Sequence, residues 1–202
     1  MKPTQSQTKN RFYLALGDSM SIDIYTRVQH GGAVSQLIRR LQGRQPEKLH
    51  WRLDDRTLDG QVIAGVDFRR SPHGPADLIT ITIGGNDLLQ NMRRPPADFI
   101  PEFTAGYQRL MTGLRQAHAG ARIVVGNIYH PQGELPPELA EGLELVNEFI
   151  GSESLVHDFR LADIHAAFLG HEDEYLTLGI EPSHAGATVI ADLFERAADQ
   201  HP

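Results

Sequence analysis

The sequence predicts a single α/β domain in which helices cover both faces of a mainly parallel sheet. Two observations lead to this fold class. Short apolar runs alternate with amphipathic stretches, and no repeat, low-complexity tract or linker separates them. The chain of 202 residues is long enough to bury a sizeable core without disulfides or a structural metal. We therefore expect one domain over residues 11–202, preceded by a flexible tail over residues 1–10.

Three strands are predicted from apolar runs rich in β-branched and aromatic residues. These runs are residues 12–16, 78–83 and 122–125, and each is followed within a few residues by Gly, Asn or Asp. Strands that are buried on both faces of a parallel sheet lose the usual alternation of polar and apolar residues. We interpret the runs as buried parallel strands that end in functional turns.

Three helices are predicted from apolar residues that recur at steps of three or four. They span about residues 101–120, 139–150 and 185–198, and Gly151 is expected to end the second. Residues 85–100 would then be the longest irregular segment. Since long loops in such folds often border the functional site, we expect this segment to lie near it.

Composition excludes several classes of function. The chain has no cysteine, which removes cysteine nucleophiles, disulfide scaffolds and cysteine-ligated metals. Its formal net charge is −7, and it has no basic run of the kind that binds nucleic acid. No apolar run approaches the roughly 18–20 residues needed to cross a bilayer. We expect a cytoplasmic protein with no nucleic-acid partner and no membrane span; its oligomeric state is left open.

Three short blocks place reactive side chains where parallel strands end or the last helix begins. Ser19 follows the first strand in Gly-Asp-Ser, Asn86 follows a central strand in Gly-Gly-Asn-Asp, and Glu181 and His184 precede the last helix. Ligands of open parallel sheets bind outside the carboxyl ends of the strands. A serine, an amide donor and an acid/base pair are the components of an acyl-transfer site.

These blocks resemble those of the SGNH (GDSL-type) serine hydrolase family, and the resemblance covers nearly the whole chain. It implies a flavodoxin-like, three-layer α/β/α fold and hydrolysis of a small-molecule ester, with Ser19 as the nucleophile of a Ser/His/Asp-type triad. It also implies an oxyanion hole formed by the backbone N–H groups of Ser19 and Gly60 and by the amide of Asn86, with Gly65 as the second choice for the glycine. Neither a cofactor nor a metal is implied.

The last block departs from the family pattern, and two alignments of it are possible. By spacing, Glu181 and His184 reproduce the acid-x-x-histidine pair, with His184 as base and Glu181 as its orienting acid. By the residues that follow, Glu181 takes the place of the family histidine, and Leu178 takes the place of the acid. In this second alignment Glu181 would act as the base in place of the histidine, alone or with a histidine from elsewhere in the chain. The remaining alternative is that catalysis is impaired.

Several other features of the sequence have alternative interpretations. A run of histidines and aspartates suggests metal ligands but matches no strong metal signature; it comprises His157, Asp158, Asp163, His165 and His171. Asp18 and Asp87 are expected to hold turns together through side-chain to backbone hydrogen bonds. The segment around Ser19 lacks the second glycine of a G-x-S-x-G elbow, and no G-x-G-x-x-G occurs.

Two further expectations concern the substrate and the competing function. Met20, Ile22, Ile24 and Tyr25 follow the nucleophile and are candidates for an acyl pocket, and both acetyl groups and longer acyl chains remain open. The competing class is a binding protein that keeps the scaffold and has lost efficient catalysis because Glu181 replaces the histidine.

Overall fold

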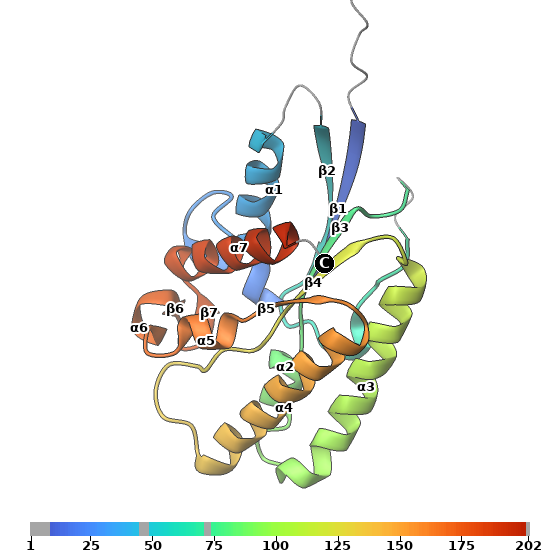
Figure 1. Ribbon diagram of the computed structural model, residues 1–202. Helices are drawn as coiled ribbons and strands as arrows, with labels where there is room; N and C mark the ends of the chain where they lie inside the picture. The colour runs from blue at the N-terminus through green and yellow to red at the C-terminus, as the bar shows by residue number, and fades with distance from the viewer. Residues whose placement is uncertain (1–8, 45–48, 71–73, 201–202) are drawn as a thin grey trace, which may run out of the picture.

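A computed structural model describes residues 9–44, 49–70 and 74–200 (Figure 1). Its centre is a five-stranded parallel sheet with the order β2-β1-β3-β4-β5. The strands are β1 (Lys9–Gly17), β2 (Leu49–Thr57), β3 (Leu78–Thr82), β4 (Arg122–Gly126) and β5 (Arg160–Ala162), and a separate antiparallel pair comprises β6 (Leu176–Thr177) and β7 (Glu181–Pro182). The predicted fold class, one α/β domain with a mainly parallel sheet, is confirmed.

Helices cover both faces of this sheet. The α-helices are α1 (Ala33–Arg44), α2 (Gly85–Gln90), α3 (Pro96–Ala117), α4 (Pro137–Val156), α5 (Ile164–Phe168), α6 (Glu172–Tyr175) and α7 (His184–Asp199), and three short 3-10 turns are η1 (Ser19–Ser21), η2 (Ile24–Thr26) and η3 (Ile63–Gly65). Figure 1 shows α1 and α7 on one side of the sheet and α3 and α4 on the other.

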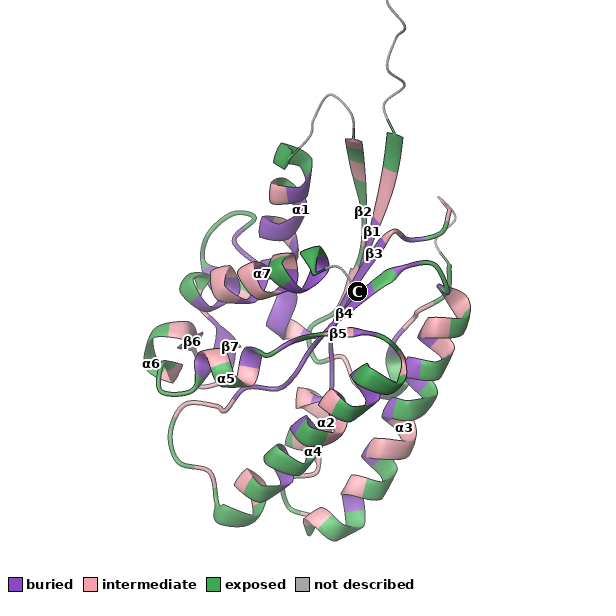
Figure 2. Cartoon of the chain, in the orientation of Figure 1, coloured by how far each residue is buried: buried purple, intermediate pink, exposed green. Residues whose placement is uncertain are grey.

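Alternate residues of β1 supply the two halves of the core. Tyr13 and Ala15 pack with the α1 and α7 side, whereas Leu14 and Leu16 pack with the α3 and α4 side. Successive side chains of a strand point to opposite faces, so a central strand covered on both faces must be apolar throughout. Figure 2 shows β1, β3 and β4 largely buried and β2, at the edge, largely exposed or intermediate.

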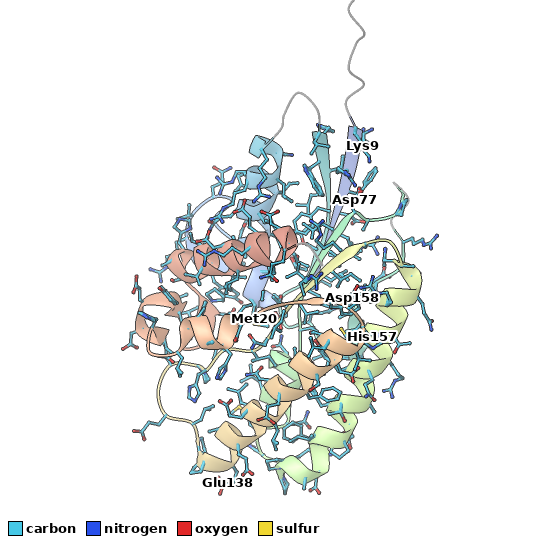
Figure 3. All side chains as sticks on the ribbon, in the orientation of Figure 1. Lys9, Met20, Asp77, Glu138, His157 and Asp158 are labelled. Carbon is cyan, nitrogen blue, oxygen red and sulfur yellow. The ribbon has the colours of Figure 1, made fainter. Side chains whose placement is uncertain are left out.

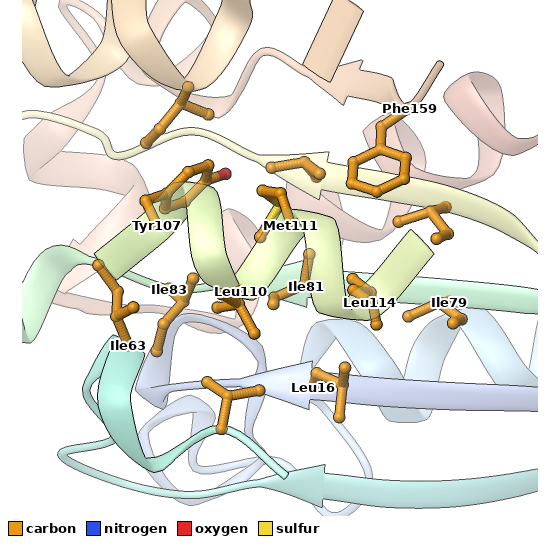
Figure 4. Packing of buried hydrophobic residues seen from close by; sticks show 14 of the residues in the cluster. Leu16, Ile63, Ile79, Ile81, Ile83, Tyr107, Leu110, Met111, Leu114 and Phe159 are labelled. Atoms are coloured by element: carbon orange, nitrogen blue, oxygen red, sulfur yellow. The ribbon is translucent and has the colours of Figure 1, made fainter. Parts of the chain in front are cut away.

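The interior on the α3 side is closely packed. Figure 4 shows Leu110 and Leu114 of α3 lying over Leu16 of β1 and Ile81 of β3. Leu16, Ile81 and Leu114 are each at most 1% exposed. Burying such a side chain contributes roughly 1.5–3 kcal/mol. This packing holds the ends of β1 and β3 at fixed positions, which matters because two of the three reactive blocks follow them.

Several predicted boundaries are wrong. The segment 85–100 is not irregular, since it contains α2 and the first turn of α3. The first predicted helix begins at Pro96, so Pro101 lies inside it, and α4 continues through Gly151 to Val156. Pro101 is the sixth residue of α3, so the backbone bond from this position to the carbonyl of Ala97 is missing. Tertiary packing overrides this cost and the modest cost of a helical glycine.

The amino-terminal segment was expected to be a tail up to residue 10. Residues 1–8 lie outside the described residues, but Lys9 and Asn10 already pair with Leu49 and His50 in the sheet. Within the described residues, none of the helices combines the length and the apolar character that crossing a membrane requires.

Candidate active site

Ser19 lies at the carboxyl end of β1, where the chain turns sharply into η1. In Figure 3, Lys9 and Asp77 mark the end of the sheet where β1 and β3 begin. Met20, the residue after Ser19, lies nearer the middle of the molecule. Gly17 makes the turn possible. It has φ +124°, and a Cβ there would lie 1.9 Å from the carbonyl oxygen of Thr82, so no larger residue fits without moving the neighbouring strand.

The Ser19 side chain is half-buried, and its backbone N–H has no hydrogen-bond partner in the part of the chain that the structure describes. The turn itself is held by neighbours. The Asp18 N–H donates to the Thr82 carbonyl at 2.9 Å, and the Asp18 carboxyl accepts from the Met20 N–H at 3.2 Å. The expected turn role of Asp18 is therefore observed. Ser19 begins a 3-10 turn rather than a helix, and the next α-helix starts only at Ala33.

Asn86 lies in the first turn of α2, directly after β3. Its side-chain Nδ2 donates to the carbonyl of Gln61 at 3.0 Å. The neighbouring Asp87 accepts from the Ile63 N–H at 3.1 Å, as expected of a residue that holds a turn. An asparagine amide has two donors, so Asn86 keeps one N–H for a ligand.

Gly60 lies in the turn between β2 and η3 and has φ +71°. The bond from Asn86 to Gln61 ties this turn to the start of α2 and brings the residue after Gly60 to the Asn86 amide. Gly65 lies four residues further along in η3, where a Cβ would meet the Gln61 side chain at 3.3 Å. The link through Gln61 favours Gly60 over Gly65 as the neighbour of Asn86.

Glu181 forms part of β7, which packs against η1. The side chain is buried, at 8% exposed, and its carboxyl interacts with the Ser19 side chain. Burial raises the pKa of Glu181, the interaction with Ser19 lowers it, and the negative charge of Asp59 raises it. Glu181 Oε2 is buried with no hydrogen-bond partner among the described residues, so the carboxylate keeps the capacity to accept a proton.

His184 lies three residues further on, in the first turn of α7, and is exposed. Its Nδ1 lies 3.4 Å from the carbonyl oxygen of Gly31, in the loop before α1. Leu178, at the position of the family acid in the second alignment, is 71% exposed. Of the two candidate bases before and in α7, the structure therefore places Glu181 beside Ser19 and His184 beside Gly31.

Asp18 is a second buried carboxyl group beside Glu181. It is 1% exposed, and burial raises its pKa to about 8, with the charge of Glu181 adding to the shift and hydrogen bonds from Met20 and Thr82 opposing it. Burial therefore favours the protonated, neutral form of Asp18. A neutral Asp18 leaves Glu181 as the single negative charge of the pair, as in other sites where two close carboxyls cannot both ionise.

A pocket opens beside Ser19 and Asn86. It contains about 100 Å³ of space that water could occupy, and its polar lining consists of Asp18, Ser19, Asn86 and Tyr129. Met20, the residue after Ser19, lines it, as expected from the sequence. Of the other candidates for an acyl pocket, Ile24 is 70% exposed, Tyr25 donates to Asp59 at 2.7 Å, and neither these two nor Ile22 lines this pocket.

The run of histidines and aspartates from 157 to 171 has local partners. His157 lies 3.4 Å from Glu153, and Asp163 caps α5 by accepting from the Ala166 N–H. His165 contacts the Asn147 amide at 3.0 Å. In the described chain, no cluster of three or more histidine or acidic side chains is arranged to hold a metal ion.

Sequence reasoning missed Tyr129, which lines the pocket and donates to the Ile180 carbonyl at 2.5 Å. Burial raises the pKa of Tyr129 well above its ordinary value, with smaller contributions from the charges of Asp18 and Glu181. The signal was available, because Tyr129 follows β4 closely, at the same edge of the sheet as Ser19 and Asn86.

Comparisons with known proteins identify the family and agree with the fold. The model of the GDSL-like lipase/acylhydrolase family matches residues 15–189. The fold is similar to that of Axe2, an acetylxylan esterase from Geobacillus stearothermophilus, with a TM-score of 0.73 at 15% identity over 98% of both chains. It is also similar to the lipase Lip_vut3 from a goat rumen metagenome, with a TM-score of 0.75 at 20% identity over 93% of this chain and 97% of that one. No curated protein matches the sequence significantly.

At these identities the two solved structures establish the fold, whereas the family match covers most of the chain, including Ser19, Asn86 and Glu181. The sequence resemblance is thereby confirmed: the chain belongs to the GDSL-like lipase/acylhydrolase family and is an ester hydrolase.

Proposed function

We propose that the protein hydrolyses carboxylic esters through an acyl-enzyme on Ser19, with Glu181 rather than His184 as the general base. The observation that carries this proposal is the buried Glu181 carboxyl beside the Ser19 side chain, on a strand that packs against η1. An unperturbed glutamate, with a pKa near 4.3, is a weak base for a serine hydroxyl. Burial raises the pKa of Glu181, which strengthens it as a base.

The proposed reaction has two steps. The Ser19 oxygen attacks the ester carbonyl carbon while its proton passes to Glu181, and collapse of the tetrahedral intermediate releases the alcohol, which takes that proton. Water then attacks the acyl-enzyme and gives a proton to Glu181. The carbon–oxygen bond to Ser19 breaks, the proton returns to Ser19, and the acid leaves.

The negative oxygen of the intermediate would be bound by three donors. The Ser19 N–H and one N–H of the Asn86 amide have no partner among the described residues, and the Gly60 N–H is the third candidate. Donors that are already in place need no reorganisation as charge develops on the substrate. The neutral form of Asp18 supports this role, because a second negative charge there would oppose the oxyanion.

A fluorophosphonate probe tests the proposal, since it reacts only with an activated serine. We expect labelling of the wild type, loss of labelling in Ser19→Ala, and full labelling in Ser35→Ala, which removes another half-buried serine.

The exposed His184 also fits a second candidate function, a binding protein without efficient catalysis. A folded wild type that is neither labelled nor able to cleave an activated short-chain ester would support that candidate instead.

A further inference from the structure

The pocket beside Ser19 becomes wholly apolar away from the reactive residues. Its polar side chains belong to the group around Ser19, and beyond them the lining described by the structure is hydrocarbon apart from the thioether of Met92. This part of the lining includes Leu88, Leu89, Met92, Phe99, Leu139 and Leu143. We name it the α2–α4 pocket, because α2 and α4 supply most of these residues.

The α2–α4 pocket runs from the surface into the core. Leu89 and Met92 are 40% and 46% exposed, whereas Phe99 and Leu143 are 3% and 4% exposed. Figure 1 shows α2 beside the amino-terminal half of α4, below the carboxyl ends of the strands. A ligand attached to Ser19 therefore has apolar surface available both at the rim and at the floor.

The chemistry of this lining discriminates between two kinds of ester. A sugar needs hydrogen-bond partners for its hydroxyl groups, and burying them without partners is costly. A hydrocarbon chain needs only apolar surface, and each buried methylene contributes about 0.8 kcal/mol. The lining away from Ser19 offers apolar surface for a hydrocarbon chain and no polar side chains for the hydroxyl groups of a sugar.

We infer that the α2–α4 pocket binds the acyl chain of the substrate, and that the preferred esters carry a hydrocarbon acyl chain longer than acetyl. This inference rests on the proposed function, because the chain reaches the pocket as part of an ester held at Ser19. It adds the class of substrate, and it assigns Leu139 and Leu143 as specificity-determining residues.

The size of the pocket supports a longer chain. The 100 Å³ that water could occupy are several times the roughly 10–15 Å³ that a single water molecule requires. The methyl of an acetyl group would fill a small part of this space and leave the remainder against apolar side chains. A longer hydrocarbon chain would fill more of it and displace the water. We expect kcat/KM to rise about fourfold per methylene until the pocket is full.

The test is a series of p-nitrophenyl esters, from acetate through butyrate, hexanoate and octanoate to decanoate, beside acetylated xylo-oligosaccharide. The inference predicts a rising kcat/KM with a maximum at hexanoate or longer. A wild type that cleaves acetate or the acetylated sugar best would overturn it while leaving the proposed function intact.

Leu139→Trp places a large side chain in the pocket at a half-buried position. We expect the ratio of octanoate to acetate turnover to fall at least tenfold, because the larger side chain takes the space that the longer acyl chain needs. Leu145→Trp is the matched control, because Leu145 lies on the same helix, is 44% exposed and does not line the pocket. An equal effect of both variants would contradict the assignment of Leu139.

Binding to Ser19→Ala separates this inference from the proposed function. Isothermal titration with butyrate, octanoate and decanoate requires no catalysis. Tighter binding of the longer acids that is lost in Ser19→Ala/Leu139→Trp supports the pocket assignment even if the wild type cleaves no ester. No binding of any acid by the folded Ser19→Ala variant, together with no chain-length preference in turnover, overturns the inference.

Discussion

The two halves of the candidate site are built in different ways. Ser19 and Asn86 follow β1 and β3, which pair directly at the centre of the sheet, with Gly17 opposite Thr82. Glu181 lies on a two-residue strand paired only with β6, outside the main sheet. The register of buried strands fixes the positions of Ser19 and Asn86. The position of Glu181 depends instead on the three-residue turn between β6 and β7. Spacing along the chain therefore predicts which candidate residues come together only where buried strands fix their positions.

Removing the proposed oxyanion donor Asn86 should have the largest effect in the half of the candidate site that follows β1 and β3. For Asn86→Ala we expect kcat to fall about 10²–10³-fold with little change in KM, because the lost donor acts mainly in the transition state. Asn91→Ala is the control, since this amide lies at the end of the same helix and donates only to the Asp87 carbonyl. Steady-state kinetics with an activated ester would show the difference; similar losses in both variants would count against an oxyanion role.

Substitutions at two glycines with positive φ test whether the two halves of the candidate site differ in rigidity. A Cβ at Gly17 would lie 1.9 Å from the Thr82 carbonyl oxygen, whereas one at Gly179, in the turn before Glu181, would meet nothing within 4 Å. We expect Gly17→Ala to lower the free energy of unfolding by about 3 kcal/mol or more, and Gly179→Ala by about 1 kcal/mol. Urea unfolding measures both, and equal losses would remove the proposed difference between the halves.

The buried Asp18 makes stability depend on pH. Its pKa is raised from 3.8 to about 8 in the folded protein, so the folded state holds this proton more tightly than the unfolded chain does. The contribution of Asp18 to stability therefore falls as the pH rises from about 4 to about 8. Asp18→Asn has no such ionisation.

We expect the Tm of Asp18→Asn to exceed that of the wild type by a margin that grows from pH 5 to pH 8, reaching at least about 2–4 °C. Asp98→Asn, which alters an exposed carboxyl on α3, should show no such trend. A margin for Asp18→Asn that is constant across this range would mean that the carboxyl ionises normally.

The smallest effect is expected at His184. Because His184 is exposed and its ring approaches Gly31 rather than Ser19, the His184→Ala variant should keep kcat/KM within about twofold of the wild type, a change typical of surface positions. A loss of tenfold or more, with the fold intact by circular dichroism, would restore the first alignment of the last block.

Much of the fold and half of the site were predictable from the sequence. The runs at 12–16, 78–83 and 122–125 became β1, β3 and β4, because buried parallel strands are apolar throughout. The strands β2 and β5 were missed, since the first is a largely exposed edge strand with charged residues and the second has three residues. Neither carries the apolar pattern on which the prediction depends.

The last block shows why the remainder of the site was not predictable. Which of Glu181 and His184 faces Ser19 depends on where the β6–β7 turn ends and α7 begins. Both side chains fit a catalytic role by residue type, and a shift of three residues exchanges them. The apolar wall of the pocket was missed for another reason: α2 was interpreted as a loop, so Leu88 and Leu89 had no assigned face.

The rate of acylation of Ser19 in Glu181→Gln tests the central claim most directly. Glutamine preserves the size of the side chain and cannot accept the serine proton, so burst kinetics with p-nitrophenyl butyrate should show acylation slowed about 10²–10⁴-fold. Substitution Glu181→His, which supplies another base at the same position, should recover part of that loss. An acylation rate in Glu181→Gln within about threefold of the wild type would contradict the assignment of Glu181 as the base.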